Sequence, residues 1–268
     1  EVFTSKGRSR WQVWSDWITI SAIAVSNATD KSHFDEREQQ YMTIVKKYTK
    51  QEVDAFADMF SILVMALEDN SEQDFLGELY MCLGLGSDHA GQFFTPYHLC
   101  EFMSAVTTPA EEFQQKIGDK GWVAVCDPTC GAGALLVAFA NECRKKEINY
   151  QTDVLFVAQD IDYIVGLMCY LQLSLMGCAG YVVIGDTLLH PSTALDRRGL
   201  IPRPDQNIWY TPFYFRDIWH YRRIWAQMDL LLQTDEKPAE QVTGKLKSSA
   251  ALPPLPLQET KTGQLTLF

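Results

Sequence analysis

The residues best suited to ligand chemistry form an acidic, glycine-rich turn, Asp127–Gly133, which reads Asp-Pro-Thr-Cys-Gly-Ala-Gly. An apolar segment, Trp122–Cys126, precedes this turn, and an apolar run, Ala134–Ala140, follows it. The pattern predicts a strand, a turn and a helix, which together are the first half of a βαβ unit. Open sheets of this kind bind ligands in the crevice at the carboxyl ends of their strands. Gly131 and Gly133 would let the backbone come close to such a ligand.

The Asp127 carboxylate favours one class of ligand. A dinucleotide fingerprint has the form Gly-x-Gly-x-x-Gly and holds pyrophosphate at a helix N-terminus. Leu136 occupies the third glycine position here, and Asp127 would repel a pyrophosphate. A ligand with a cationic amino-acid end therefore fits better than a nicotinamide dinucleotide. An ordinary strand-turn-helix without any ligand is the simplest alternative.

The turn resembles the S-adenosylmethionine (SAM) loop of adenine-N6 DNA methyltransferases, which usually reads Asp-Pro-x-Cys-Gly-x-Gly. A second segment, Gly91–Pro96, reads Gly-Gln-Phe-Phe-Thr-Pro. It resembles a segment upstream of the SAM loop in this family, including type I restriction-modification methylase subunits, where it lies over the methionine end of SAM. The sequence predicts a helix over Tyr97–Val106, with Pro96 in its first turn and Thr95 as its cap. Alone, the hexapeptide could mark a helix start and nothing more.

Two further acidic positions follow in the family's order. Val154–Ala158 predicts a second strand followed by Asp160, where an acidic residue can accept hydrogen bonds from both ribose hydroxyls. Ile161 is then expected against the adenine ring. A third strand, Tyr181–Ile184, is followed by Gly-Asp-Thr-Leu with Asp186, which is similar to the family's Gly-Asp-(Ser/Thr)-Leu. The resemblance implies that Asp186 meets the adenine amino group.

The resemblance implies SAM as the cofactor and a set of residues that binds it. These residues are Phe93, Phe94, Thr95, Pro96, Asp127, Pro128, Thr129, Gly131, Gly133, Asp160, Ile161 and Asp186. The predicted fold class is α/β, a truncated Rossmann-like sheet of the SAM-dependent methyltransferase type that follows a helical domain. We expect the helical domain over residues 1–88, the SAM-binding domain over residues 89–233 and a disordered tail over residues 234–268. A complete sheet of that type would add further strands near residues 216–233, where the sequence instead predicts one helix.

Methyl transfer to adenine requires a site for the target amino group as well as a cofactor. The family uses (Asp/Asn)-Pro-Pro-(Tyr/Phe) after a fourth strand, whose polar groups accept the amino hydrogens and whose ring stacks on a flipped-out base. Neither Asp-Pro-Pro nor Asn-Pro-Pro occurs in this chain. The nearest candidates for catalytic residues are Thr211, Pro212, Phe213 and Tyr214. Such a clamp would need a fourth parallel strand beside Val123–Asp127 that ends at Thr211, and a loop across the sheet edge is the alternative.

Composition limits how the chain could meet DNA. The formal net charge of −11 argues against binding through bulk charge. A local arginine cluster could contact phosphate, although a solvated helix face explains it equally well. The arginines of this cluster are Arg197, Arg198, Arg203, Arg216, Arg222 and Arg223.

Cysteine usage and hydropathy predict a cytoplasmic protein. The seven cysteines have no paired Cys-x-x-Cys spacing, which favours reduced thiols over disulfides, and we expect no metal site. We see no signal peptide. The uncharged run over residues 164–185 is long enough to suggest a membrane span, but Gln172, Ser174 and a glycine break favour a core helix followed by a buried strand.

The chain ends in Gln264–Phe268, which reads Gln-Leu-Thr-Leu-Phe. It resembles the peptide that bacterial polymerases and repair proteins present to the replication sliding clamp, and an inert tail is the alternative. Two functions stay open. One is a SAM-dependent methyltransferase acting on adenine N6 in DNA, completed by a specificity subunit or a second methylase subunit. The other is a SAM-binding accessory protein without catalysis, recruited to DNA or to the clamp.

Overall fold

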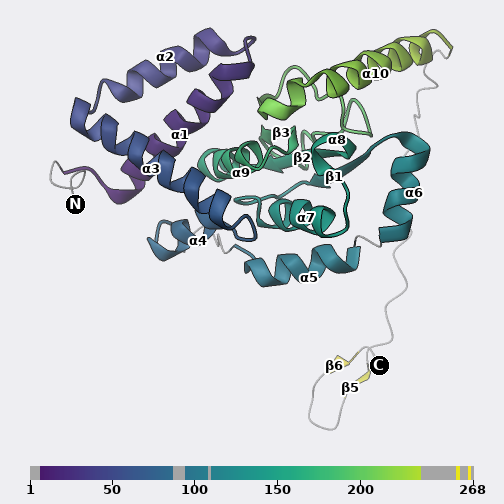
Figure 1. Cartoon of the computed structure of the whole chain (residues 1–268), viewed down its shortest axis with the longest axis horizontal. Coiled ribbons are helices and arrows are strands. Elements are labelled where there is room, and N and C mark those ends of the chain that lie inside the picture. Colours follow the sequence, from purple (N-terminus) through teal and green to yellow (C-terminus); the bar gives the residue numbers. More distant parts are fainter. Residues whose placement is uncertain (1–6, 87–93, 108–109, 237–257, 260–264, 267–268) are drawn as a thin grey trace. The chain divides into compact units, whose positions relative to one another are not determined.

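The computed structural model describes residues 7–86, 94–107, 110–236, 258–259 and 265–266. Within them the chain is a mixed α/β protein, in which N-terminal helices precede a four-stranded, mostly parallel sheet (Figure 1). The predicted α/β class is confirmed. Internal contacts divide the chain into two units, residues 1–228 and residues 229–268. The predicted domain boundary after residue 88 lies outside the described residues and stays a prediction.

Helices dominate the first half of the chain. The described helices before the sheet are α1 (Arg10–Thr29), α2 (Phe34–Val45), α3 (Lys50–Asp69), α4 (Phe75–Cys82), α5 (Tyr97–Thr107) and α6 (Ala110–Lys120). Local signals set several of their starts. Thr49 and Glu52 form a capping box at the start of α3, in which each side chain accepts the other's backbone amide. Asp74 caps α4 by accepting the Gly77 amide at 3.0 Å.

The second half alternates strands with helices. In chain order it contains β1 (Val123–Asp127), α7 (Ala134–Lys145), α8 (Tyr150–Asp153), β2 (Val154–Asp160), α9 (Tyr163–Leu175), β3 (Ala179–Ile184), β4 (Asn207–Tyr210), the 3₁₀-helix η2 (Pro212–Phe215) and α10 (Asp217–Glu236). Two short strands in the second unit, β5 (Gln258–Glu259) and β6 (Leu265–Thr266), pair with each other. The three strands predicted from apolar runs are present, because turn residues mark the end of each one.

The strands lie in the order β1-β2-β3-β4. Strands β1, β2 and β3 are parallel, with Asp160 opposite Ile184. Strand β4 runs antiparallel to β3, with Tyr210 opposite Tyr181. The clamp prediction required a fourth parallel strand beside β1. Strand β4 is instead antiparallel and lies beside β3. The connection over residues 185–206 contains no helix, and such a loop can reach an antiparallel neighbour, whereas a parallel one needs a crossover.

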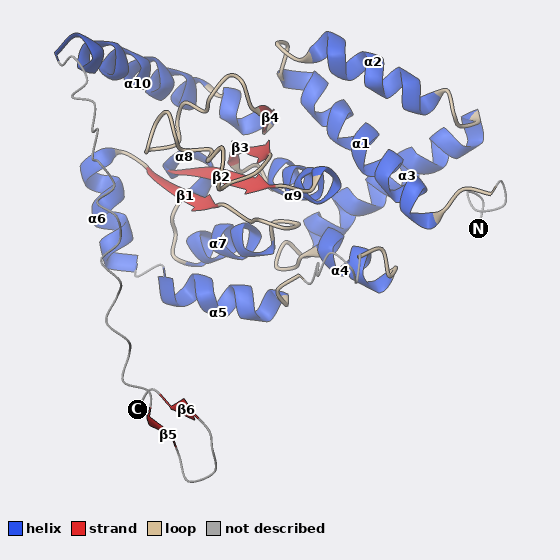
Figure 2. Cartoon of the chain, turned by 180° about the vertical axis from the view of Figure 1, so that it is seen from behind, coloured by secondary structure: helices blue, strands red, loops and turns tan. Residues whose placement is uncertain are grey.

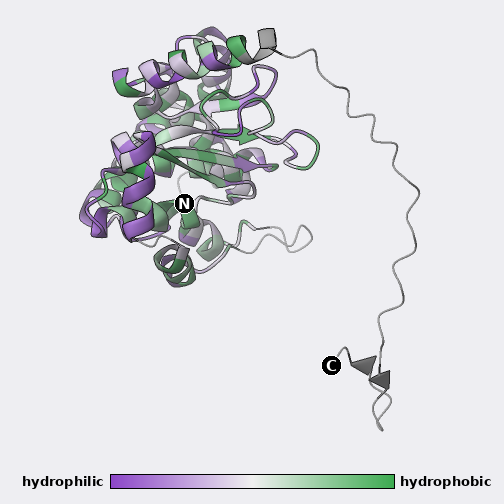
Figure 3. Ribbon diagram, turned by 90° about the vertical axis from the view of Figure 1, so that its right-hand side faces the viewer, coloured by the Kyte–Doolittle hydropathy of each residue, from purple (hydrophilic) through white to green (hydrophobic). Residues whose placement is uncertain are grey.

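Both faces of the sheet are covered over its central strands, which are strongly hydrophobic (Figure 3). On one face α7 and α9 pack against β2, with Leu136, Phe156 and Leu167 fully buried. On the other face Tyr181 of β3 lies in one cluster with Trp219 from the start of α10. Figure 2 shows α7 and the start of α10 on opposite sides of the sheet. Strand β2 is buried on both faces, as is usual for the centre of a parallel sheet.

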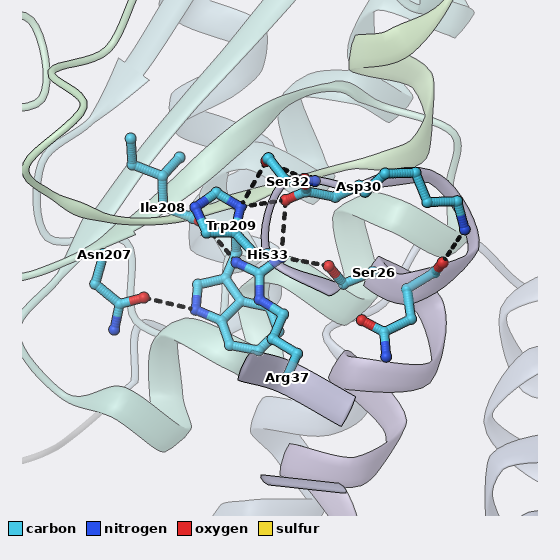
Figure 4. Close-up of polar contacts among 10 residues, drawn as sticks. Ser26, Asp30, Ser32, His33, Arg37, Asn207, Ile208 and Trp209 are labelled. Atoms are coloured by element: carbon cyan, nitrogen blue, oxygen red, sulfur yellow. Dashed lines mark hydrogen bonds and ion pairs between the residues drawn. The ribbon is translucent and has the colours of Figure 1, made fainter. Parts of the chain in front are cut away.

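A buried ion pair joins the N-terminal helices to β4 (Figure 4). Arg37 of α2 donates to Asp30 Oδ2 at 2.9 Å and to the Ile208 carbonyl of β4 at 2.7 Å. Its guanidinium carbon lies 4.0 Å from the centre of the Trp209 ring. Burial alone would raise the pKa of Asp30, but hydrogen bonds from its neighbours in the α1–α2 turn and the Arg37 charge hold it below its usual value. These contacts hold α1 and α2 against the β4 edge of the sheet.

The long uncharged run of the sequence forms the interior of the protein. Its first part is α9, and its second part is β3, and both are almost entirely buried. This arrangement is the core helix and buried strand that the sequence predicted. Among the described residues, no helix combines the length and the apolar character that crossing a membrane requires.

Candidate cofactor site

An aspartate lies at or just beyond the carboxyl end of each parallel strand. These residues are Asp127 on β1, Asp160 on β2 and Asp186 after β3. In the register of the sheet, Asp127 is opposite Ala158, so the turns that follow β1 and β2 are neighbours. Because parallel strands end at the same edge, the three turns come together there, as the sequence predicted.

Hydrogen bonds tie the three turns into one wall. The Gly131 amide donates to Asp160 Oδ2 at 2.9 Å, which joins the first turn to the second. The Gly185 amide donates to the Asp160 carbonyl at 2.8 Å, which joins the third turn to the second. The Thr187 hydroxyl donates to the Pro128 carbonyl at 2.6 Å and closes the set. The protein itself thus fixes the turns relative to one another.

The two glycines of the first turn have backbone conformations that other residues rarely adopt. Gly131 has a φ of 56° and Gly133 a φ of 97°. A Cβ atom on Gly133 would lie 2.9 Å from the Cys169 Sγ of α9, and one on Gly131 would lie 3.4 Å from the Phe94 ring. Gly133 therefore allows α7 to begin close to α9, and Gly131 leaves room beside Phe94.

Asp160 and Ile161 form the second turn. Asp160 accepts the Gly131 amide through Oδ2 and the Asp162 amide through Oδ1, both at 2.9 Å. Each carboxylate oxygen has a second lone pair, so a ribose hydroxyl could still bind. The Ile161 side chain is 73% exposed and offers an apolar surface next to this carboxylate. Asp162 caps α9 by accepting its first amides at 2.9 and 3.0 Å.

A buried glutamine organises the third turn. Gln159 Nε2 donates to the His190 carbonyl at 2.9 Å, and its Oε1 accepts the Ser192 amide at 2.8 Å. Asp186 Oδ1 accepts the Leu188 amide at 2.8 Å, which closes a tight turn. The role of Gln159 was not predicted from the sequence. A polar side chain that directly follows the apolar run Val154–Ala158 within β2 was the available signal, because buried amides need partners.

Two cavities share Asp74, Phe94 and Thr95, and the smaller of them lies at the turn after β1. The smaller, of about 220 Å³, is lined by Asp74, Phe94, Thr95, Cys100, Met103, Asp127, Thr129, Cys130, Gly131, Ala132, Ala134 and Leu135. The larger, of about 640 Å³, is lined by Asp74, Gly77, Glu78, Met81, Cys82, Phe94, Thr95, Pro96, Tyr97, His98 and Glu101. Both linings carry carboxylates, and among the described residues neither carries a lysine or an arginine.

The carboxylates of the cavity wall are held in surroundings that disfavour their charge. Burial raises the pKa of Asp127; a hydrogen bond from the Thr129 amide opposes the rise, and the nearby Asp160 adds to it. Burial also raises the pKa of Asp74, against a hydrogen bond from Gln172. A cationic ligand would stabilise both carboxylates, whereas a pyrophosphate would be repelled. Binding of a cationic ligand, which the sequence predicted from Asp127, stays a prediction.

Asp74 and Gln172 belong to the site although the sequence analysis selected neither. Gln172 of α9 is fully buried and donates from Nε2 to Asp74 Oδ1 and to the Ala132 carbonyl, both at 2.8 Å. Its Oε1 accepts the Leu76 amide at 3.2 Å. Gln172 thus connects α4, α9 and the first turn. Its signal in the sequence was an amide inside an apolar helix, which must find partners within the protein.

The structure does not bring the predicted catalytic residues to this edge. These residues are Thr211, Pro212, Phe213 and Tyr214. Because β4 is antiparallel to β3, the carboxyl end of β4 lies beside the start of β3. Thr211 is therefore at the amino ends of the parallel strands, opposite to the ends that carry Asp127, Asp160 and Asp186. Thr211 is fully buried, donates to the Cys178 carbonyl at 2.7 Å and accepts the Gly180 amide at 3.0 Å. The Tyr214 hydroxyl donates to the Leu200 carbonyl at 2.7 Å. The predicted amino-group clamp has no support in this geometry, because these side chains build the core.

Most arginines of the predicted phosphate-binding cluster make contacts within the protein. Arg222 donates to the carbonyls of Thr152 and Gly121, and Arg223 donates to the Tyr214 carbonyl. The others pair or stack locally, Arg198 with Asp196, Arg203 with Asp205 and Arg216 over Phe213. Arg197 is exposed. The guanidinium groups of Arg222 and Arg223 therefore serve mainly to hold α10 to the rest of the fold.

Parts of two predicted motifs lie outside the described residues. These are Gly91, Gln92 and Phe93 in the segment Gly91–Pro96, and all but Leu265–Thr266 of the terminal peptide Gln264–Phe268. Helix α5 begins at Tyr97, and the Pro96 carbonyl accepts the Cys100 amide at 3.3 Å. The helix thus begins at the predicted residue, and Pro96 stands immediately before it rather than inside its first turn. In the described part of the chain, no group of three or more histidine, cysteine, aspartate or glutamate side chains could hold a metal.

The parallel strands, the linked turns and the acidic cavities define a Rossmann-like α/β protein with a ligand site at the carboxyl edge of its sheet. The family model for N-6 DNA methylases matches residues 71–215, more than half of the chain. The chain therefore belongs to the N-6 DNA methylase family. The match begins just before α4 and ends with η2, so it includes all three turns of the site. No curated protein and no solved structure gave a significant match.

Proposed function

We propose that this chain binds SAM at the carboxyl edge of the sheet and forms the cofactor-binding part of a DNA methyltransferase that acts on adenine N6. The observation that carries this proposal is the acidic lining of the smaller cavity, which includes Asp74 and Asp127 and lies beside the turn after β1. SAM carries positive charge on its sulfonium and on its ammonium group. It is therefore attracted by Asp127 and Asp74, whose charges lack a lysine or arginine neighbour in the described lining.

Each turn of the site has a role in this proposal. Phe94, with Thr95 and Pro96, covers the methionine end of SAM, and Asp127 faces its ammonium group. Asp160 accepts hydrogen bonds from the ribose hydroxyls, and the exposed Ile161 packs against the adenine ring. Asp186 accepts a hydrogen bond from the adenine amino group. SAM supplies an electrophilic methyl group, and the protein residues hold and orient it.

A second candidate is a SAM-binding accessory protein without catalysis. The position of Thr211 favours it, because this hydroxyl is fully committed to the backbone of β3 and cannot accept the amino group of a target base. In either case DNA, a specificity subunit or second methylase subunit, and the sliding clamp are the proposed partners. The clamp would bind the terminal peptide Gln264–Phe268.

Calorimetry and methyl transfer test the proposal in sequence. We expect heat of binding from SAM and none from a nicotinamide dinucleotide, because the acidic wall accepts a cation and repels pyrophosphate. Transfer of a labelled methyl group from SAM to adenine in DNA is then measured with the chain alone and with candidate partner subunits. Transfer supports the methyltransferase, and binding without transfer in every mixture supports the accessory protein. Uptake of the dinucleotide with no response to SAM would contradict both.

A further inference from the structure

The two outer strands of the sheet, β4 and β1, differ in how far the rest of the protein covers them. At the β4 edge, the Ile208 carbonyl accepts a hydrogen bond from Arg37, and α1 and α2 lie alongside. At the other edge, β1 pairs with β2, and in the described part of the chain no strand or side chain is hydrogen-bonded to its outer side. An open edge leaves backbone amides and carbonyls ready to pair with another strand.

The side chains of β1 are also left partly uncovered. Ala124 and Cys126 are exposed, whereas Leu155 and Val157, their partners on β2, are fully buried. The layer that covers this face of the sheet therefore stops at β2. Parallel sheets are normally buried on both faces. Strand β1, which leads into the turn Asp127–Gly133 of the proposed SAM site (the cofactor turn), therefore lacks the neighbours that such a strand usually has.

A cavity of about 570 Å³ lies along this edge. It is lined by Phe113, Lys116, Lys120, Trp122, Val123, Ala124 and Arg198. Its floor is apolar, and all three of its charged lining residues are cationic, in a chain whose net charge is −11. Lys116 and Lys120 are exposed positions on α6. The edge therefore combines free backbone groups with an apolar floor and a basic rim.

We propose that the β1 edge accepts an extended segment of a second polypeptide, a strand with apolar side chains over the apolar floor of this cavity and acidic side chains facing Lys116, Lys120 and Arg198. Strand addition of this kind draws affinity from main-chain hydrogen bonds and specificity from the pockets beside the edge. Charge complementarity selects the occupant. A second copy of this chain paired edge to edge would bring the same cations against each other, which disfavours self-association.

The position of the edge links this partner to the cofactor site. Strand β1 ends at Asp127, so one end of an added strand would lie beside the turn that we propose to bind SAM. A partner bound there could place its own side chains at the site. The docking itself does not depend on SAM binding, so the two proposals can fail separately.

The experiment uses short capped peptides of alternating valine and glutamate, with lysine-for-glutamate and backbone N-methylated versions as controls. Binding is read from hydrogen exchange of the β1 amides and from chemical-shift titration of the full chain. We expect the glutamate peptide to protect the outer β1 amides. We expect no protection from the N-methylated peptide, because its methyl groups remove the main-chain donors and block the close approach that strand pairing needs. Binding of SAM is measured in parallel on the same samples.

Charge reversal sharpens the test. Lys116→Glu/Lys120→Glu should weaken the glutamate peptide about tenfold and bind the lysine peptide instead, because two attractions become repulsions. Lys46→Glu/Lys50→Glu, at exposed positions near the start of α3, makes the same change in net charge and should alter neither affinity. Unchanged circular dichroism establishes that both variants fold. Equal binding of both peptides, no protection of β1, or a dimer whose β1 amides are already protected would each overturn the proposal.

Discussion

The carboxylates around the cofactor turn are held in two ways, and the difference assigns them different roles. Asp160 and Asp186 accept backbone amides that fix the second and third turns. Asp127 accepts the Thr129 amide at 3.1 Å, and burial raises its pKa. Its surroundings therefore disfavour its charge, and a cationic ligand would stabilise it.

Asp127→Asn tests this role. We expect SAM affinity to fall by roughly 10- to 100-fold, since a hydrogen bond to a charged group contributes about 1.5–3 kcal/mol. Because the raised pKa means that the ionised carboxylate costs stability at neutral pH, the variant should melt at the same or a slightly higher temperature. Calorimetry and thermal denaturation measure the two effects. Asp119→Asn, at an exposed position on α6, is the control and should change neither.

The same carboxylate predicts how binding depends on pH. Its pKa lies above the ordinary value of 3.8, so it becomes protonated while the pH is still above that value. The affinity of the wild-type chain for SAM should therefore decline as the pH falls toward 3.8, and that of Asp127→Asn should decline much less over the same interval. Parallel pH profiles of the two proteins would contradict a role for Asp127 in holding the cation.

Thr211→Ala tests the structural role of Thr211 in the core. Its loss leaves the buried Gly180 amide with one fewer acceptor, so we expect a decrease of about 1–3 kcal/mol in the free energy of unfolding. SAM affinity should be unchanged, because Thr211 lies at the amino ends of the parallel strands, away from the proposed SAM site. Chemical denaturation and calorimetry measure both, and Thr211→Ser should restore most of the stability. A stable variant that loses methyl transfer would instead favour the clamp.

At the scale of elements, the cofactor turn depends on how closely α7 approaches α9. Gly133 begins α7 in a left-handed conformation, and its missing Cβ leaves space for Cys169 of α9. Gln172, one helical turn further along α9, then reaches the Ala132 carbonyl. The shape of the ligand site is thus set by the packing of two helices as well as by the turn itself.

Gly133→Ala should disturb this packing. A left-handed φ costs a non-glycine residue about 1–2 kcal/mol, and the new methyl group would meet the Cys169 sulfur. We therefore expect a loss of about 2 kcal/mol or more in stability, together with weaker SAM binding. Gly118→Ala is the matched control. A Cβ at this exposed position of α6 meets nothing within 4 Å, and alanine should stabilise the helix by roughly 0.5–1 kcal/mol. Equal behaviour of the two variants would refute the packing argument.

At the scale of the whole molecule, the sheet has one protected edge and one open edge. The helices α1 and α2, held by Arg37, protect β4, whereas β1 carries the cofactor turn and faces the cavity with the basic rim. This asymmetry is compatible with a protein that performs its function together with other polypeptides. The terminal peptide Gln264–Phe268 offers a second possible contact of that kind.

Removal of this peptide tests the predicted contact with the sliding clamp. A chain ending at Gly263 should lose measurable affinity for a bacterial sliding clamp, because the apolar side chains of the terminal peptide would supply the whole interaction. Surface plasmon resonance with immobilised clamp compares the two forms. SAM binding, which uses the first unit of the chain, should be the same in both. Equal clamp binding by both forms would end the idea.

The sequence by itself determined the parts of this protein that depend on neighbouring residues. Apolar runs bounded by turn residues predicted β1, β2 and β3, and the spacing of Asp127, Asp160 and Asp186 placed them at successive strand ends. Parallel strands joined by helices can share one ligand edge without any further information about the fold. The predicted family follows from the same local motifs.

The tertiary structure alone decided which strands are neighbours and what the remaining polar groups do. Hydrophobic periodicity reports that a segment is buried, but it does not report beside which strand it lies or in which direction. For this reason the sequence could not reveal that β4 runs antiparallel at the far edge, with Thr211 in the core. Nor could it reveal that β1 is an edge strand. The partners of Gln159 and Gln172 were equally hidden, because each bonds to chain segments far away in sequence.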